Sequence, residues 1–328
     1  MAAVTQIIIA GPIDAAGQAL LDARPELDCA LLERPSAAEI DAHIEAAEGL
    51  LLRITPFTAG TITRARRLRV VSRFGVGYDN VDVPALTERG IPLTITGDAN
   101  AVTVAELTLG LMLAVARRLV ALDARARVGD YAVDAGAASD LSGKTALVVG
   151  FGRVGRRVAK RCQAFDMMVI VADPFVSRNE IEGDGYHHVA DVNAAIDRAD
   201  FVTLHLPAQP DGRPVMGPEQ FARMKPGAYL VNAARGSLVD EAALHRALAE
   251  GRLGGAALDV LRDEPPAPDN PLLALDSVIL TPHCASLTND CIRRMSVVAV
   301  QNLLDGIDGR LRLEFVVNRA TLAPGSGW

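Results

Sequence analysis

The chain has 328 residues, half of them hydrophobic and 4% aromatic, with a formal net charge of −7. This length predicts about two domains with a large aliphatic core, and the negative charge excludes a general attraction for nucleic acid or an anionic membrane. The four cysteines, at positions 29, 162, 284 and 291, follow no metal-ligand spacing, so we expect no bound metal and a reducing compartment.

The N-terminal residues carry neither the basic region nor the long apolar run of a signal peptide. The apolar runs of the chain are also shorter than a membrane span requires. We therefore expect a soluble, cytoplasmic protein.

The first hundred residues alternate short apolar runs with helical patterns, which predicts a parallel α/β layout. The predicted strands cover 6–10, 28–32, 49–53, 68–73 and 91–96, with helices at 15–23 and 37–47. The first strand leads into Gly11-Pro12-Ile13, which lacks the glycine spacing of a phosphate-binding loop. This part of the chain is therefore not the expected nucleotide site.

A long apolar helix predicted over 102–118 precedes a second α/β region and is expected to be buried between domains or subunits. Six apolar runs follow it and predict a second doubly wound sheet, at 145–149, 167–172, 201–206, 229–232, 256–260 and 278–281. A helical segment at 291–304 then leads to the apolar residues 315–318, which we expect to return to the first domain. The predicted fold is therefore α/β, with two doubly wound parallel-sheet domains: a discontinuous one (1–98 and 290–320) and one over 99–289, before a tail at 321–328.

The sequence KTALVVGFGRVG at 144–155 joins a buried strand to a helix through glycines at 150, 152 and 155. In a G-x-G-x-x-G turn, Gly150 permits the sharp bend, Gly152 lets the backbone approach a diphosphate, and Gly155 lets the helix lie close to the strand. The N–H groups at the helix start then attract the phosphates. The motif predicts a Rossmann dinucleotide-binding domain.

The next predicted strand ends at Asp173, 18 residues after Gly155. An acidic side chain at about this distance takes the ribose hydroxyls of NAD. The carboxylate also repels a 2′-phosphate, so we expect NAD in preference to NADP. Arg178 lies nearby and leaves open a softer preference.

Polar residues follow three later strands: Arg235, Asp259 with Glu264, and His283. In open α/β sheets, ligands sit at the carboxyl ends of the strands, so these side chains point to one crevice. Arg235 can hold the carboxylate and carbonyl of a 2-oxo acid, while a protonated His283 supplies the proton and Glu264 favours and orients the imidazolium. Taken singly, each has a structural alternative: a surface ion pair, a turn residue and a core histidine.

Several stretches together resemble the D-isomer-specific 2-hydroxyacid dehydrogenases, close to the phosphoglycerate dehydrogenases but without a regulatory domain. They are NAARGSLVDEAAL (232–244), ALDVLRDEPP (257–266), TPHCAS (281–286), GFGRVGRRVA (150–159), SRFGVGYDNVDV (72–83) and NAVTVAELTLGLMLAVAR (100–117). These stretches cover most of the chain from about 50 to 320. The resemblance implies a flavodoxin-like substrate domain beside the NAD domain, and a catalytic triad of Arg235, Glu264 and His283.

The resemblance also implies the cofactor and substrate contacts. Arg153 and Val154 would lie along the diphosphate, Leu206 and Pro207 would seat the adenosine half, Ala233 and Ala234 would line the nicotinamide pocket, and Asp259 would bind the nicotinamide side. Substrate would lie in an interdomain cleft, with its carboxylate on the backbone N–H groups of Val76 and Gly77 and its variable end facing the 53–55 loop. A homodimer would form largely through the nucleotide domains, with residues 102–118 and the following segment contributing.

Further comparison within this resemblance narrows the substrate. Related formate dehydrogenases carry Gln where Glu264 stands, and phosphite dehydrogenases carry Lys near Val76, so neither substrate is expected. Arg53 stands where phosphoglycerate dehydrogenases bind phosphate, although Ile54 and Pro56 are not phosphate ligands, and a surface arginine is the alternative. Cys284 replaces the commoner Gly or Leu beside the histidine.

Two functions fit this resemblance. The first is an NAD-dependent reductase of small 2-oxo acids of the 3-phosphohydroxypyruvate, glyoxylate or hydroxypyruvate type. The second is an NAD(H)-sensing regulator, because certain transcriptional corepressors share the fold and the triad. Those regulators add disordered tails, and this chain carries almost none, so we favour the enzyme.

Overall fold

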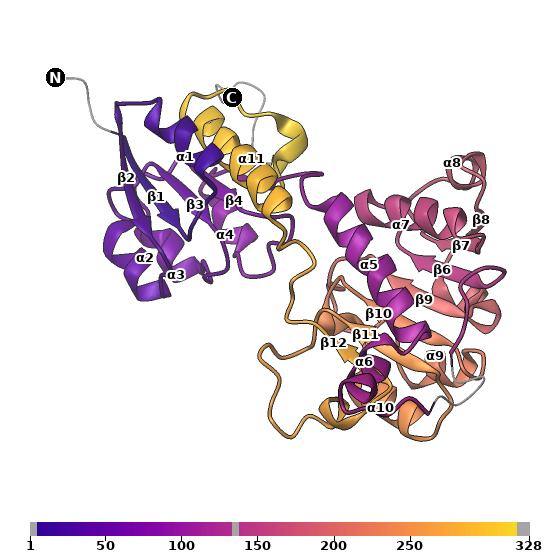
Figure 1. Cartoon of the computed structure of the whole chain (residues 1–328). Helices are drawn as coiled ribbons and strands as arrows, with labels where there is room; N and C mark the ends of the chain where they lie inside the picture. Colours follow the sequence, from indigo (N-terminus) through magenta and orange to yellow (C-terminus); the bar gives the residue numbers. More distant parts are fainter. Residues whose placement is uncertain (1–4, 133–137, 320–328) are drawn as a thin grey trace. The chain divides into compact units, whose positions relative to one another are not determined.

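The computed structural model describes residues 5–132 and 138–319, and the chain divides into two compact units (Figure 1). The first unit comprises Met1–Asn100 and Ser286–Trp328, and the second comprises Ala101–Ala285. The predicted tail at 321–328 lies outside the described residues.

The first unit is built on a five-stranded sheet in the order β2-β1-β3-β4-β5, with all strands parallel. The strands are β1 (Thr5–Ala10), β2 (Leu27–Leu32), β3 (Gly49–Leu52), β4 (Val70–Arg73) and β5 (Leu93–Thr94). β3 is buried along its whole length, as expected for a parallel strand that is covered on both faces.

Helices cover both faces of this sheet, because alternate strand side chains point to opposite sides. Ile8, Leu50 and Leu52 pack on one face with the apolar residues of three short helices, α2 (Ala37–His43), α3 (Ala59–Arg64) and α4 (Val83–Glu88). Ile9 and Leu51 pack on the other face with α1 (Ala15–Asp22) and α11 (Asn289–Ile307). Figure 1 shows the yellow α11 beside the indigo α1, although the two helices are far apart in the sequence.

The segment after α11 completes the first unit at its β5 edge. Val316 forms an antiparallel bridge with Thr94, and the buried Asn318 side chain accepts a hydrogen bond from Leu93 N and donates one to Ile91 O, both at 2.9 Å. The C-terminal stretch is therefore part of the fold formed by the first hundred residues.

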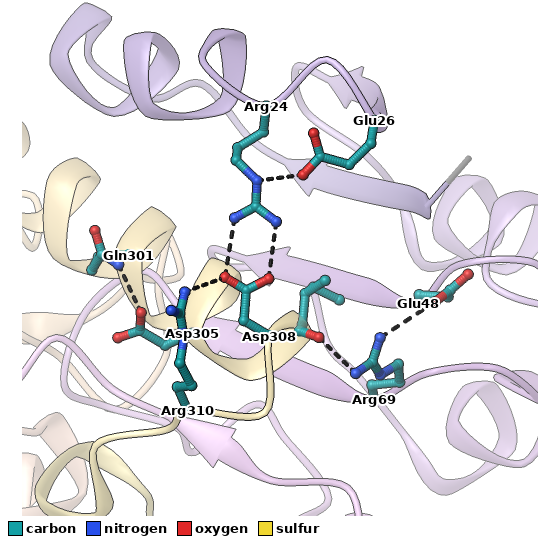
Figure 2. A network of polar contacts seen from close by, with 9 residues as sticks. Arg24, Glu26, Glu48, Arg69, Gln301, Asp305, Asp308 and Arg310 are labelled. Atoms are coloured by element: carbon teal, nitrogen blue, oxygen red, sulfur yellow. Dashed lines mark hydrogen bonds and ion pairs between the residues drawn. The ribbon is translucent and has the colours of Figure 1, made fainter. Parts of the chain in front are cut away.

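Polar contacts hold the C-terminal end of α11 against the amino-terminal ends of the strands (Figure 2). The Arg24 guanidinium donates to both carboxylate oxygens of Asp308, at 2.9 and 3.2 Å, and also pairs with Glu26. Arg69 donates to Ile307 O at 2.6 Å. The Arg24 hydrogen bonds lower the pKa of Asp308 although burial opposes them, so this carboxylate is held in its charged form.

The second unit is built on a seven-stranded parallel sheet in the order β12-β11-β10-β9-β6-β7-β8. Its strands are β6 (Thr145–Val149), β7 (Met168–Ala172), β8 (His187–Val189), β9 (Phe201–Leu204), β10 (Tyr229–Asn232), β11 (Gly255–Leu258) and β12 (Val278–Leu280). The expected pair of doubly wound parallel sheets is thus confirmed. The edge strand β8 is an addition, because its His-His-Val sequence has no apolar run to predict it.

Helices and turns again cover both faces of the second sheet. One face packs against α9 (Pro218–Arg223), α10 (Glu241–Ala249) and short 3-10 turns. The other packs against α5 (Ala101–Ala116), α7 (Arg153–Ala164) and α8 (Arg178–Gly183). α6 (Leu119–Arg127) follows α5 and buries none of its residues. Among the described residues, no helix is both long and apolar enough to cross a bilayer.

Candidate cofactor and active site

The glycine turn after β6 is shaped by close backbone packing. Gly150 adopts a φ of +96°, and a Cβ added there would lie 2.6 Å from His205 O at the end of β9. A Cβ added at Gly155 would lie 1.9 Å from Gly150 O. Both positions therefore exclude a side chain, so that α7 can start directly against the strand.

Gly152 has the opposite surroundings. It is the N-cap of α7 and makes no side-chain cap hydrogen bond, and a Cβ added there would meet no atom within 4 Å. The N–H groups at a helix start need acceptors, and this start faces open space at the β9/β6 switch point, where the strand order reverses. The turn fits a dinucleotide diphosphate, which Arg153 and Val154, the first residues of α7, would hold.

The Asp173 side chain, directly after β7, is buried and bound by backbone groups. Its Oδ2 accepts from Phe151 N at 2.7 Å, and its Oδ1 accepts from Phe175 N and Val176 N at 2.8 and 3.0 Å. Burial raises the pKa of this carboxyl, but the three N–H donors outweigh burial and the net pKa is lowered. A charged carboxylate is therefore fixed against the glycine turn, where ribose hydroxyls can donate to it.

Leu206 and Pro207 follow β9 on the other side of the glycine turn. The Leu206 side chain is close to Gly150, since a Cβ added at Gly150 would lie 2.9 Å from Leu206 Cδ2. Directly before it, His205 is bonded through Nε2 to Thr203 Oγ1 at 3.0 Å. Burial lowers the pKa of His205 to about 3, so the ring is neutral at physiological pH.

Arg235 sits in a turn after β10 that Asn232 builds. The Asn232 side chain accepts from Ala234 N at 3.0 Å and donates to Arg235 O at 2.8 Å. The Arg235 side chain is half-buried, and its Nη1 donates to Ala234 O at 2.7 Å. Ala233 and Ala234 thus lie at the same strand end as the guanidinium.

Asp259, buried after β11, holds the turn that carries His283. Its Oδ1 accepts from Thr281 Oγ1 at 2.5 Å and from Cys284 N at 2.9 Å, and its Oδ2 accepts from Ala285 N at 2.9 Å. His283 has a φ of +50°, unusual for a residue with a side chain, and its N–H donates to Asp259 O at 2.8 Å. The aspartate therefore stabilises the strained backbone at the histidine.

Glu264 and His283 form a direct pair. The Nδ1 atom of His283 lies 2.7 Å from Glu264 Oε2, while Glu264 Oε1 accepts from Leu261 N at 3.0 Å. The Glu264 and His283 side chains are 37% and 55% exposed, so the pair is open to a ligand. With Glu264 accepting the Nδ1 proton, Nε2 on the far side of the ring is left for proton exchange.

The turn after Arg235 and the loop that carries Glu264 are in close contact. A Cβ added at Gly236 would lie 2.0 Å from Leu261 C and O. β10, β11 and β12 are also neighbours in the sheet. The structure therefore brings Arg235, Asp259, Glu264 and His283 to the edge of the second sheet that also carries the glycine turn.

The other predicted substrate contacts belong to the first unit. Arg53 follows β3, and Val76 and Gly77 follow β4, at the carboxyl edge of that unit's own sheet. The Arg53 Nη1 donates to Pro12 O at 2.7 Å, and its Cζ lies 4.6 Å from the Phe74 ring centroid. Arg53 is therefore a half-buried side chain packed into this edge, and its burial lowers its pKa.

Asn232, Thr281 and His205 support the site but are not among the predicted residues. Asn232 and Thr281 stand within the NAAR and TPH stretches, next to predicted residues, so the motif boundaries were the available signal. His205 follows an apolar run and has no comparable signal, because its role depends on contacts between strands.

The fold and the glycine turn define a dinucleotide-binding α/β protein, and comparisons with known proteins narrow this class. Residues 109–285 match the family described as D-isomer specific 2-hydroxyacid dehydrogenase, NAD binding domain. The chain is 37% identical over 275 residues to a glyoxylate reductase of Korarchaeum cryptofilum, covering 82% of each protein. It therefore belongs to the D-isomer-specific 2-hydroxyacid dehydrogenase family.

Two further similarities describe its relatives. The chain is 43% identical over 281 residues to D-3-phosphoglycerate dehydrogenase of Methanocaldococcus jannaschii, covering 85% of this chain and 53% of that protein. It thus spans about half the length of such relatives. The crystal structure of the TT0316 protein from Thermus thermophilus superposes with a TM-score of 0.86 at 36% identity, covering 95% of this chain and all of that one.

Proposed function

We propose that the protein is an NAD-dependent D-2-hydroxyacid dehydrogenase. It transfers a hydride between NAD(H) and the 2-carbon of a small 2-oxo or D-2-hydroxy acid. The observation that carries this proposal is the Glu264–His283 pair at 2.7 Å, on the same sheet edge as an open glycine turn. The family membership supports the same reaction.

In the reductive direction the 2-oxo acid gains one hydride and one proton. The nicotinamide of bound NADH supplies the hydride. Arg235 binds the substrate carboxylate and polarises the carbonyl through forked, charge-assisted hydrogen bonds. His283 delivers the proton from Nε2 to the carbonyl oxygen, and Glu264 orients the ring through Nδ1.

The substrates we propose first are 3-phosphohydroxypyruvate, glyoxylate and hydroxypyruvate. Relatives named for phosphoglycerate and for glyoxylate support this range. Arg53, with Val76 and Gly77, is proposed to bind the anionic groups of the substrate. Arg53 uses one N–H on Pro12 O, and a guanidinium has five donors in all.

The test is NADH oxidation by the purified chain against these three acids. His283→Gln should lower kcat by about a thousandfold, the range for loss of a general acid. Arg235→Ala should lower kcat/KM by roughly a hundredfold, as expected for a lost bidentate charged contact. His43→Gln, an exposed histidine on α2, is the matched control. Normal turnover in His283→Gln would refute the assignment.

An NAD(H)-sensing regulator is the competing outcome of the same experiment. Tight NADH binding without turnover of any acid would favour it over the enzyme. NADH binding that disappears in His283→Gln or Arg235→Ala would instead contradict the separate roles given to the triad and the glycine turn.

We propose a homodimer formed largely through the second unit, with residues 102–118 and the following segment, α6 and residues 128–132, contributing. Large apolar side chains are exposed here: Leu119 by 52%, Val120 by 59%, and Val128 and Tyr131 by 80% each. Four exposed apolar side chains within thirteen residues favour an association surface here. Val120→Glu should convert a dimer to a monomer in light scattering, whereas Leu273→Glu, at an exposed leucine on a 3-10 turn, should not. A monomeric wild type would refute the proposal.

We propose the cytoplasm as the compartment. Cys29, Cys162, Cys284 and Cys291 are all free thiols, and thiols persist in a reducing compartment. Thiol titration of the denatured protein, isolated under trapping conditions, should find all four cysteines reduced.

A further inference from the structure

The helix α8, which follows the Asp173 loop, is rich in acidic residues whose partners are arginines near the cofactor turn. Glu180 and Glu182 lie within α8 and Asp184 directly follows it. The helix buries Ile181 in the core, but its acidic side chains are exposed and take no part in that packing. These charges lie close to Asp173, the carboxylate proposed to bind the ribose, so they can influence which cofactor binds.

Arg156 connects this helix to the cofactor turn. Its Cζ lies 4.5 Å from the Phe151 ring centroid, and Phe151 N is the donor that holds Asp173 Oδ2. The Arg156 Nη2 lies 2.6 Å from Glu180 Oε1, and its Nη1 lies 3.8 Å from Asp184 Oδ2. The helix thus neutralises a guanidinium that packs on the residue whose N–H binds Asp173.

Arg178 is neutralised in the same way. It lies five residues after Asp173, at the first position of α8, and its Nε is 2.8 Å from Glu182 Oε1 one turn later. The position of Arg178 in the sequence leaves open a weaker preference for NAD over NADP. In the structure, the Glu182 carboxylate binds this guanidinium and opposes that effect.

NADP differs from NAD by a 2′-phosphate on the adenosine ribose, which arginine binds well through its planar fork of donors. We infer that α8 is a second selector for NAD over NADP, acting through Glu180 and Glu182. The two carboxylates withhold Arg156 and Arg178 from a 2′-phosphate, and they repel its negative charge. This inference rests on the proposed cofactor site but not on the proposed reaction.

Because these ion pairs are exposed, they can be changed without destabilising the fold. The four side chains are between 36% and 72% exposed, and exposed ion pairs contribute little to stability. Neutralising the two glutamates should therefore leave the fold intact, release Arg178 from Glu182 and leave Arg156 with only the longer contact to Asp184 at 3.8 Å. Asp173 differs, because its carboxylate binds three backbone N–H groups and its replacement also disturbs the turn.

The experiment is calorimetric titration of NADH and NADPH into the wild type, Asp173→Asn, Glu180→Gln/Glu182→Gln and the triple variant. In Asp173→Asn, NADH binding should weaken while NADPH binding stays poor. The triple variant should bind NADPH about tenfold more tightly than Asp173→Asn, which corresponds to about 1.4 kcal/mol. Glu219→Gln, whose Arg223 partner is one turn away at 3.8 Å on α9, is the matched control and should leave the NADPH/NADH ratio of Kd unchanged.

Equal NADPH affinity in Asp173→Asn and the triple variant would overturn the inference, as would full inversion of preference by Asp173→Asn alone. If Asp173→Asn does not fold, the double glutamine variant tests the inference on its own. Its NADPH/NADH ratio of Kd must then be at least threefold lower than that of the wild type. A wild type that binds neither cofactor refutes the cofactor site, and the inference falls with it. Binding without turnover refutes only the reaction.

Discussion

The two sheets of this protein have the same doubly wound design, but their switch points are built differently. In the second unit, β6 leads to α7 through Gly152, which leaves the helix start without a side-chain cap and with open space in front. In the first unit, β1 leads to α1 through Gly11 and Asp14, and the Asp14 carboxylate accepts from Ala16 N at 2.8 Å.

The first turn residue after the strand is a crowded glycine in both units. A Cβ added at Gly11, whose φ is +121°, would lie 2.4 Å from Arg53 Cδ. Gly150, directly after β6, is crowded in the same way, because a Cβ added there would lie 2.6 Å from His205 O. The two units therefore differ in capping: the start of α7 has no side-chain cap, whereas the start of α1 is capped by Asp14. The proposed cofactor site thus lies at the switch point whose helix has no side-chain cap.

The largest effect is expected from adding a methyl group at the close contact that lets α7 start against β6. Gly155→Ala places a methyl group 1.9 Å from Gly150 O, so the turn must move. We expect an unfolding free energy lower by about 3 kcal/mol and NADH affinity lower by roughly a hundredfold. Denaturant unfolding and calorimetry measure the two effects. Gly60→Ala on α3, with its nearest atom at 3.8 Å, is the control.

A second variant would give the second unit the cap that the first unit has. Gly152→Asp should add an N-cap to α7 and stabilise the protein by about 0.3 kcal/mol, the usual difference between Asp and Gly at an N-cap. The same carboxylate stands where the diphosphate binds, so NADH affinity should fall by roughly a hundredfold. A stable variant that still binds NADH normally would show that the diphosphate lies elsewhere.

The reverse change removes the cap from the first unit. Asp14→Ala leaves Ala16 N without its acceptor and should lower the unfolding free energy by about 1 kcal/mol. NADH affinity should not change, because Asp14 belongs to the unit without the glycine turn. A parallel loss of NADH binding in calorimetry would contradict the division of roles between the two switch points.

The smallest expected effect concerns acid stability of the first unit (Figure 2). The hydrogen bonds from Arg24 lower the pKa of Asp308 below its ordinary value of 3.8. Its contribution is therefore present above that pH and is lost as the pH falls toward the lower, folded-state value. Asp308→Asn should flatten the acid side of a thermal-stability profile between about pH 5 and pH 2. Asp28→Asn, at an exposed residue on β2, should keep the wild-type slope.

Much of the architecture was predictable because its determinants are local. The sequence predicts strand β6 with its observed bounds, since five small, apolar or β-branched residues before a glycine motif favour a single interpretation. The position of Arg235, Asp259 and His283 at strand ends was also predictable, because parallel strands present their carboxyl ends at one edge. The predicted strand at 91–96 was too long, since only Leu93–Thr94 pairs with β4.

The rest depended on contacts between distant residues, which local patterns do not encode. β8 exists because Ile170, Val171 and Ala172 of β7 pair with it, and its own residues show no strand signal. The sequence alone determined that Asp173 ends a strand beside the glycine turn. Only the tertiary structure decided that three backbone N–H groups bind its carboxylate and that Glu182 pairs with Arg178, because hydrogen bonds and ion pairs need side chains brought within about 3 Å.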